Sequence, residues 1–179
     1  LEYRLLLTHD KENNMREILT LQARYNQFAN DNMLKVLETL SPSDLQKDVG
    51  VYYTSIIGTF IHILEADIAI LLGIINSYAP NPLDTKALQD ALASGLQNKS
   101  FESLITLRRQ ADRLIIDLVD SIADFNAVRE LSFPGISFKK SIAQYFLSIL
   151  NHGTHHRGQI AAILDIMNVP NDFAGMLGM

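Results

Sequence analysis

The pattern of apolar and polar positions predicts a chain that is helical almost throughout. Apolar side chains recur every three or four residues over long stretches, which is the period of a helix with one buried face. This pattern predicts four long helices, at residues 13–40, 51–78, 100–126 and 137–167, and a weak helix at 85–96. Since no stretch alternates convincingly as a strand, the sequence favours an all-α fold, a four-helix bundle with short extra helical turns.

Breaks in the pattern coincide with prolines, which lack the backbone donor that a helix needs. Pro42 ends the first helix and opens a short turn, and the Pro80-Asn81-Pro82 run ends the second. Residues 126–138 are expected to form a loop or a short extended segment that dips into the core. The residues from 168 onward predict a cap with one further short turn.

The second predicted helix is apolar on almost every face, so it is expected to be the most buried. It contains His62, and the positions that share a face with this histidine, at 100° per residue, are all small. They are Ser55, Gly58, Thr59, Ala66, Ala69 and Gly73. Two interpretations are compatible with each other: small residues let another helix approach closely, or they leave space for a ligand above the histidine.

The fourth predicted helix carries three of the five histidines of the chain, at residues 152–156. His152 and His156 are four residues apart, so they lie on one face, and this face is the apolar one. His155 points about 100° away from His156 and is expected to lie on the surface or beside the site. Together with His62, the two inward histidines can supply three nitrogen ligands to one metal ion.

The alternative to a metal site is a set of hydrogen-bonded core histidines. Two inward imidazoles four residues apart favour the metal, because each buried imidazole needs partners for two nitrogens. The pattern differs from the zinc-protease motif H-E-x-x-H, since Gly153 stands where that motif has its glutamate. Three neutral nitrogen ligands would leave a coordination position open. We expect one divalent ion per chain, zinc or nickel first, with manganese or iron as alternatives.

The length and net charge of the chain limit how many domains it can form and which partners it can bind. The 179 residues fit one domain, which we place at residues 15–179, with residues 1–14 as a leader or extension outside the globular pattern. A net charge of −5 argues against nucleic acid as a partner, because phosphate binding needs a basic surface. The longest apolar run, at 68–75, is shorter than a membrane span, so no membrane association is expected.

The chain contains no cysteine, which excludes disulfides, thiolate metal ligands and a cysteine nucleophile. The first residues show neither the basic region nor the long apolar region of a secretory signal. Both observations are compatible with a cytoplasmic protein, which is the expected location.

Three stretches of the chain resemble the DinB-like (DinB/YfiT) superfamily, and the resemblance covers nearly the whole chain from Met15. The stretches are Tyr25 to Asn30, Ser55-Ile56 followed by His62 to Asp67, and the most specific one, Asn-His-Gly-Thr-His-His-Arg-Gly-Gln-Ile at 151–160. Val169-Pro170 is also similar to the way members of this family end.

The resemblance implies an up-down-down-up four-helix bundle, a homodimer and a divalent metal held by three histidines. The histidine of the family's second helix corresponds to His62. The first and last histidines of its H-x-x-x-H-R-G-Q motif correspond to His152 and His156, so the ligand set agrees with the one expected from helical geometry.

The function implied is that of a metalloenzyme whose open position binds water or a substrate thiolate. Relatives in this superfamily include thiol-dependent S-transferases and a thiol-dependent isomerase. The expected reaction is therefore transfer to a low-molecular-weight thiol, with metal-dependent hydrolysis as a second form. The alternative is a non-catalytic metal-binding protein, with a structural or stress-response role, in which the ion mainly adds folding free energy. No catalytic residue is assigned.

For the residues near the histidines in the sequence we expect supporting or surface roles. Gln159 lies about 60° from His156 on the helix and could contact a ligand histidine, whereas Arg157 points away and is expected on the surface, at an interface or at a helix end. Asp67 and Glu65 are expected to be solvated charges rather than partners of a ligand imidazole. Packing and capping are the roles expected for Tyr25-Asn26, in preference to catalysis.

Overall fold

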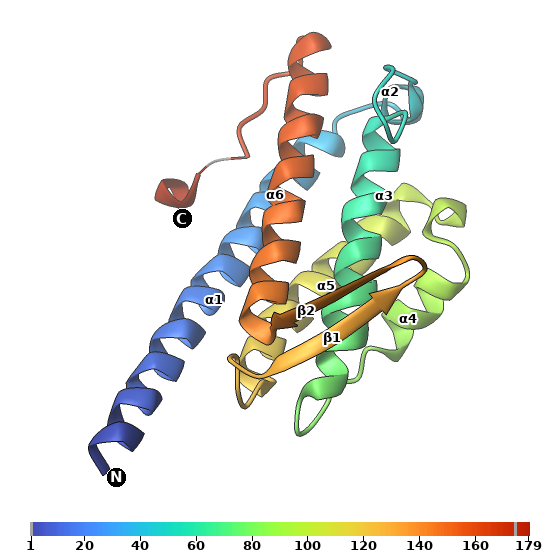
Figure 1. The fold of residues 1–179 in the computed structure, drawn as a ribbon. Coiled ribbons are helices and arrows are strands. Elements are labelled where there is room, and N and C mark those ends of the chain that lie inside the picture. Colours follow the sequence, from blue (N-terminus) through green and yellow to red (C-terminus); the bar gives the residue numbers. More distant parts are fainter. Residues whose placement is uncertain (1, 174) are drawn as a thin grey trace.

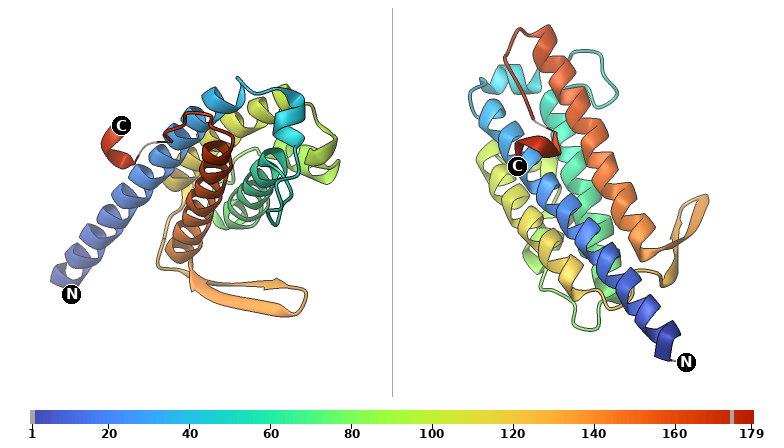
Figure 2. Two further views of the ribbon diagram at one scale, coloured as in Figure 1. Left: turned by 90° about the horizontal axis from the view of Figure 1, so that it is seen from above. Right: turned by 90° about the vertical axis from the view of Figure 1, so that its left-hand side faces the viewer.

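The structure, a computed structural model, describes residues 2–173 and 175–179, with side chains described from Asn14 onward. The chain is mostly helical and carries one two-stranded antiparallel sheet. The long helices lie alongside one another (Figures 1 and 2): α1 (Glu2–Leu37), α3 (Ile56–Ala66), α5 (Phe101–Ser121) and α6 (Ile142–Ile166). The short ones are α2 (Pro42–Gln46), α4 (Lys86–Ala93), η3 (Leu96–Asn98) and η4 (Met176–Gly178).

Contacts between the long helices place α1 against both α5 and α6, and α3 against α6. The α3 helix continues without a break through the π-helical segment η1 (Asp67–Ile75) and the 3-10 turn η2 (Asn76–Tyr78), and η1 packs on α4, α5 and α6. The first turns of α1 project beyond the other helices (Figure 2). They belong to residues 1–14, which we expected to lie outside the domain, yet the helix begins at Glu2 rather than at 13.

Three of the long helices begin at serines that cap them, and the caps of α3 and α6 correct the predicted starts. The hydroxyl oxygens of Ser55, Ser100 and Ser141 each accept a hydrogen bond from the backbone N–H three residues later. In consequence α3 begins at Ile56 rather than at 51, and α6 begins at Ile142 rather than at 137. Gln144 completes a capping box with Ser141, a sequence signal that marks the true start of α6.

The expectation that the chain has no strand was wrong. The segment predicted as a loop or a short extended segment, together with the predicted start of the fourth helix, forms an antiparallel hairpin of β1 (Val128–Phe133) and β2 (Ile136–Ser141). Its two-residue turn contains Gly135 at φ +83°, a conformation that glycine adopts readily. Of the apolar residues expected to enter the core, Leu131 is buried, while Phe133 and Ile136 lie partly in solvent.

The helix from Ile56 to Tyr78 is the most apolar of the chain and is long and apolar enough to cross a membrane by length and composition alone. Half of its most apolar window is buried inside the protein, where Phe60, Leu64 and Leu71 contribute fully buried side chains. Core helices of globular proteins have the same composition, so this segment is explained by the core that it forms.

The π-helical turn changes which residues share a face with His62. A π-helix has a wider turn than an α-helix, so the 100° spacing assumed for the second helix does not hold beyond Asp67. A Cβ on Gly73 would lie 3.3 Å from the side chain of Gln89, on α4, so this glycine permits close packing of α4. Gly58 likewise permits a close backbone approach, 2.1 Å from its Cβ position to the carbonyl oxygen of Tyr53.

Candidate metal centre

Three histidine side chains converge between α3 and α6, as predicted from helical spacing. His62 lies on α3, and His152 and His156 lie one turn apart on α6. The Nε2 atom of His152 is 2.9 Å from Nε2 of His62 and 3.0 Å from Nε2 of His156, and ligand atoms of all three lie within 4.8 Å of one another. His156 is buried, the other two are half-buried, and His155 is exposed.

The arrangement of these nitrogens fits a metal ion better than it fits hydrogen bonding. Two nitrogens bound to one ion at about 2.0–2.1 Å can be at most about 4.2 Å apart, a limit that both short Nε2 separations meet. A neutral imidazole has only one N–H, so hydrogen bonding within the cluster would need a single Nε2–H of His152 shared between two acceptors, whereas a metal ion can accept the lone pairs of all three Nε2 atoms. The buried Nδ1 of His152 has no hydrogen-bond partner within the described part of the chain, and an ion at Nε2 would not change this.

Gln159 determines which nitrogen of His156 carries the proton. Its Oε1 lies 2.7 Å from Nδ1 of His156 and can only accept, so Nδ1 donates and Nε2 keeps its lone pair toward the other histidines. The amide nitrogen of Gln159 lies 3.2 Å from Nε2 of His155 and donates to it. Gln159 therefore contacts the cluster as the helical angle suggested, and a hydrogen bond of this kind orients metal-binding histidines in proteins.

Tyr53 covers the cluster, a position that the sequence did not indicate because residue 53 was expected in a helix. Its hydroxyl lies 2.8 Å from Nε2 of His62, and its ring stacks on the imidazole at a centroid distance of 3.9 Å. The loop that presents it is closed by a bridge between Val51 and Thr54. Thr54 has φ +63°, which is unusual for a β-branched residue and indicates local strain.

Burial favours the neutral, metal-binding form of two of the imidazoles, those of His62 and His152. Burial, followed by the charges of neighbouring histidines, lowers the pKa of His152 to about 4. The pKa of His62 is lowered by the same two causes. Burial raises the pKa of the Tyr53 hydroxyl, so at neutral pH this group is a phenol that can donate a hydrogen bond.

A second polar cluster lies in the core, and it contains a residue that we expected in solvent. Asp67 is buried at the start of η1, where its carboxylate accepts a 2.7 Å hydrogen bond from Arg108, on α5. Arg108 is fully buried, and it also donates to both carboxylate oxygens of Asp112, at 3.1 and 2.8 Å. The prediction of a solvated Asp67 was wrong because its buried partner comes from another helix.

Arg157 extends this cluster, and the expectation that it lies on the surface was also wrong. It is 2% exposed, and its guanidinium donates to the side-chain oxygens of Asn26 and Asn30 at 2.6 and 3.0 Å. The amide nitrogens of both asparagines donate to Asp112 in turn, at 3.3 and 2.9 Å. We call the six residues the buried charge network: Asn26, Asn30, Asp67, Arg108, Asp112 and Arg157.

The buried charge network lies directly behind the histidines. Arg157 follows His156 in the chain, and Gly153 follows His152. A Cβ on Gly153 would lie 3.2 Å from a guanidinium nitrogen of Arg157 and 3.3 Å from the side-chain oxygen of Asn26, so a glycine here lets α1 and the guanidinium approach α6.

Burial raises the pKa of Asp112, a member of the buried charge network, to about 6, against the opposing effect of Arg108.

The remaining residues that the sequence singled out lie at the edge of these clusters. Tyr25 packs against Arg157, whose guanidinium carbon is 5.8 Å from the centre of its ring. Glu65 is half-buried on α3, and none of the hydrogen bonds found among residues with described side chains joins it to a histidine. The side chain of His9 lies outside the described residues.

Comparison with known proteins identifies the family of the chain. The model of the DinB family matches residues 13–169, which is most of the chain. Protein DinB of Bacillus subtilis (strain 168) is 24% identical over 160 residues, which cover 87% of this chain and 91% of that protein. No solved structure matches significantly. The chain therefore belongs to the DinB family.

Proposed function

We propose that the protein binds one divalent metal ion through Nε2 of His62, His152 and His156. The observation that carries this proposal is the convergence of the three Nε2 atoms, two pairs of which lie 2.9 and 3.0 Å apart. Imidazole nitrogens suit zinc, nickel and iron, and for the native ion we propose zinc or nickel before manganese or iron.

We further propose that the bound ion is catalytic. Three protein ligands leave a coordination position open, and an ion there lowers the pKa of a bound thiol or water so that it is a nucleophile at neutral pH. The reaction that we favour forms a bond between the sulfur of a low-molecular-weight thiol and an electrophilic carbon. The bond from that carbon to its leaving group breaks, the leaving group departs with the electron pair as an anion, and the thiol proton passes to solvent. Metal-dependent hydrolysis is the second form of the same chemistry.

The protein's own groups would position the reactants. Gln159 holds His156 with its Nε2 lone pair toward the ion site. The hydroxyl of Tyr53 now contacts the same nitrogen of His62 that would bind the metal. If the lone pair of this His62 nitrogen bound the metal, the Tyr53 hydroxyl would be free to donate a hydrogen bond to the molecule at the open coordination position. Such a hydrogen bond would align that molecule for reaction.

The arrangement of the long helices supports a four-helix bundle of the up-down-down-up kind, with α1, α3, α5 and α6 as its members. In support, α1 contacts α5 and α6, and α3 contacts α5 and α6.

We propose that the protein is a homodimer located in the cytoplasm. Light scattering at several protein concentrations would test the dimer.

Turnover is tested with metal-loaded protein, a low-molecular-weight thiol and an electrophilic aromatic substrate whose conjugation is followed by absorbance. We expect conjugation that requires both metal and protein and that disappears in His156→Ala. If the wild-type protein binds the ion but gives no conjugation or hydrolysis above the metal-free control, the catalytic proposal is wrong, and the non-catalytic metal-binding role takes its place.

A further inference from the structure

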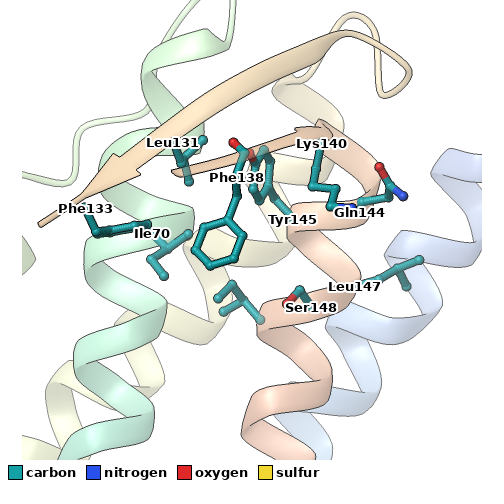
Figure 3. Close-up of a pocket in the computed structure, with 10 residues that line it drawn as sticks. Ile70, Leu131, Phe133, Phe138, Lys140, Gln144, Tyr145, Leu147 and Ser148 are labelled. Carbon is teal, nitrogen blue, oxygen red and sulfur yellow. The ribbon is translucent and has the colours of Figure 1, made fainter. Parts of the chain in front are cut away.

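A cavity of about 560 Å³ lies beneath the β1–β2 hairpin (Figure 3). Its walls come from the hairpin, from η1 and from the first turns of α6. Most of the side chains that line it are apolar, and they include Ile70, Leu131, Phe138, Tyr145 and Ile149. This volume and lining are those of small-molecule sites, which occupy about 300–1,000 Å³.

The hairpin presents one apolar face, and this face covers the cavity. Side chains alternate along a strand, and residues directly opposite in an antiparallel pair point to the same side. The register pairs Leu131 with Phe138 and Phe133 with Ile136, so these four share a face. Phe133 and Phe138 remain 38% and 40% exposed, so protein atoms alone do not fill the space beneath the hairpin.

Tyr145 holds the hairpin at a fixed position over α6. Its hydroxyl donates to the backbone carbonyl oxygens of Arg129 and Phe138, at 3.0 and 2.5 Å, and thereby joins α6 to both strands. Because its polar atom is engaged with the hairpin backbone, the ring is left as an apolar wall. The cavity is therefore braced by hydrogen bonds rather than left by loose packing.

Residues of the cavity and of the histidine cluster lie on the same face of α6. Tyr145, Ile149, His152 and His156 are spaced four, three and four residues apart, so they lie on one face of the helix. Ile149 precedes His152 by about 4.5 Å along the helix axis. On the opposite wall, Ile70 belongs to the same continuous helix as His62. The cavity and the cluster thus share two walls.

Lys140 supplies a charge at the outer wall of the cavity. It lies on β2, two residues beyond Phe138 and on the same face, and it lines the cavity while its side chain is exposed. Among the residues with described side chains, no carboxylate forms an ion pair with it. An acidic group on a bound molecule would satisfy this ammonium.

We propose that the cavity binds the organic part of the substrate: a small molecule with an aromatic or branched apolar body, an acidic group at Lys140 and its reacting end toward His152. The assignment of the molecule as a substrate rests on the proposed metal-dependent function. Binding itself depends only on the cavity, so it can be measured on metal-free protein and separated from the metal chemistry.

Two naphthalene dyes test the proposal with metal-free, full-length protein. 8-Anilinonaphthalene-1-sulfonate is apolar and anionic, and N-phenyl-1-naphthylamine has the same rings without the sulfonate. We expect saturable binding of both dyes, weakened about tenfold or more by Phe138→Ser, which removes an apolar wall, and by Ser148→Phe, which fills the space. Lys140→Ala should weaken only the sulfonate, by about threefold.

Val128→Ser is the matched control, because Val128 is exposed on the opposite face of the same hairpin and does not line the cavity. It should leave both affinities unchanged, and circular dichroism should show all variants folded. Added copper(II) should quench the bound dye in wild-type protein but not in His156→Ala, which reports that the dye lies beside the cluster.

The proposal is overturned if the folded protein shows no saturable dye binding, or if Phe138→Ser and Ser148→Phe bind both dyes as tightly as wild type. It is also overturned if light scattering shows a wild-type dimer that binds no dye and dissociates in Phe138→Ser, since a second copy would then occupy the cavity. Metal content after reloading with zinc or nickel is measured in parallel: a wild-type protein that binds the dyes but retains no ion after reloading contradicts the metal proposal while supporting the cavity.

Discussion

The two polar clusters of this protein lie side by side on α6, and they differ in how their groups are satisfied. In the buried charge network, two guanidiniums, two carboxylates and two amides pair with one another at 2.6–3.3 Å. In the histidine cluster, nitrogens face nitrogens, and the buried Nδ1 of His152 has no partner within the described residues. The charges of the first cluster pair with one another, whereas the second cluster presents three nitrogens that could hold a cation.

This difference separates a structural role from a binding role. The network joins α1, η1, α5 and α6 through groups that are costly to bury unpaired, so it sets how these helices lie relative to one another. The histidines are placed by that arrangement, with one on α3 and two on α6. Substitutions in the network should therefore change stability most, and substitutions at the histidines should change metal affinity most.

The largest effect is expected for Arg108→Met, which leaves Asp67 and Asp112 buried without their cation. We expect the free energy of unfolding to fall by about 3–5 kcal/mol, measured by urea denaturation of the metal-free protein. Arg109→Met is the matched control, since Arg109 is half-exposed and lies 3.8 Å from its acidic neighbours, and it should change stability by less than about 1 kcal/mol. Equal losses would show that the network is not structural.

Removing the support of a ligand histidine should act on affinity rather than on the fold. Gln159→Leu removes the acceptor for Nδ1 of His156, so we expect metal affinity about 10–100-fold lower, measured by competition with a chelating dye. His155→Ala is the control, because it removes only the exposed partner of Gln159. An unchanged affinity in Gln159→Leu would contradict the role given to this hydrogen bond.

Two glycines of α6 provide a smaller, matched test of the close approach behind the histidines. A Cβ at position 158 would have no neighbouring atom within 4 Å. Gly158→Ala should therefore stabilise the helix by about 0.5–1 kcal/mol, because alanine is the better helix former. Gly153→Ala would crowd Arg157 and Asn26, and its strain of about 1–3 kcal/mol should exceed that gain. If thermal unfolding shows both variants stabilised, the network has more freedom than its distances imply.

The smallest effect expected is a change in the pH dependence of stability. The pKa of His152 is about 4 in the folded protein and 6.5 as a free side chain, so the unfolded chain binds more protons between these values. Its contribution to stability is therefore lost as pH falls from 6.5 toward 4, and metal-free His152→Asn should lose less stability than wild type between pH 7.5 and 5. The raised pKa of Asp112 makes its contribution to stability change with pH in the opposite direction, but Asp112 is present in both proteins and does not affect the comparison. Parallel profiles would contradict the assignment.

The sequence predicted the histidine cluster because its members lie on long, regular helices, where a spacing of four residues determines the face. It did not predict Tyr53, since a loop with φ +63° at Thr54 replaces the first turn of the expected helix. Nor did it predict the burial of Asp67 and Arg157. A charged side chain is expected in solvent unless a buried partner is known, and here the partners lie on other helices.

The hairpin was missed for a related reason. Only Leu131, Phe133, Ile136 and Phe138 signal its apolar face, and a proline and a glycine interrupt the run between the strands. The proline fits because it stands in the turn, where no ladder hydrogen bond is needed. Alternation over two short strands is a weak signal beside the long helices that surround it.

Metal binding by the three histidines is tested by the metal content of metal-free protein reloaded separately with zinc and nickel. The account predicts about one ion per chain in wild type and in His155→Ala, and none retained after gel filtration in His62→Ala, His152→Ala and His156→Ala, with all variants folded by circular dichroism. A wild-type protein that retains no ion, or a loss in His155→Ala equal to that in His156→Ala, would contradict it.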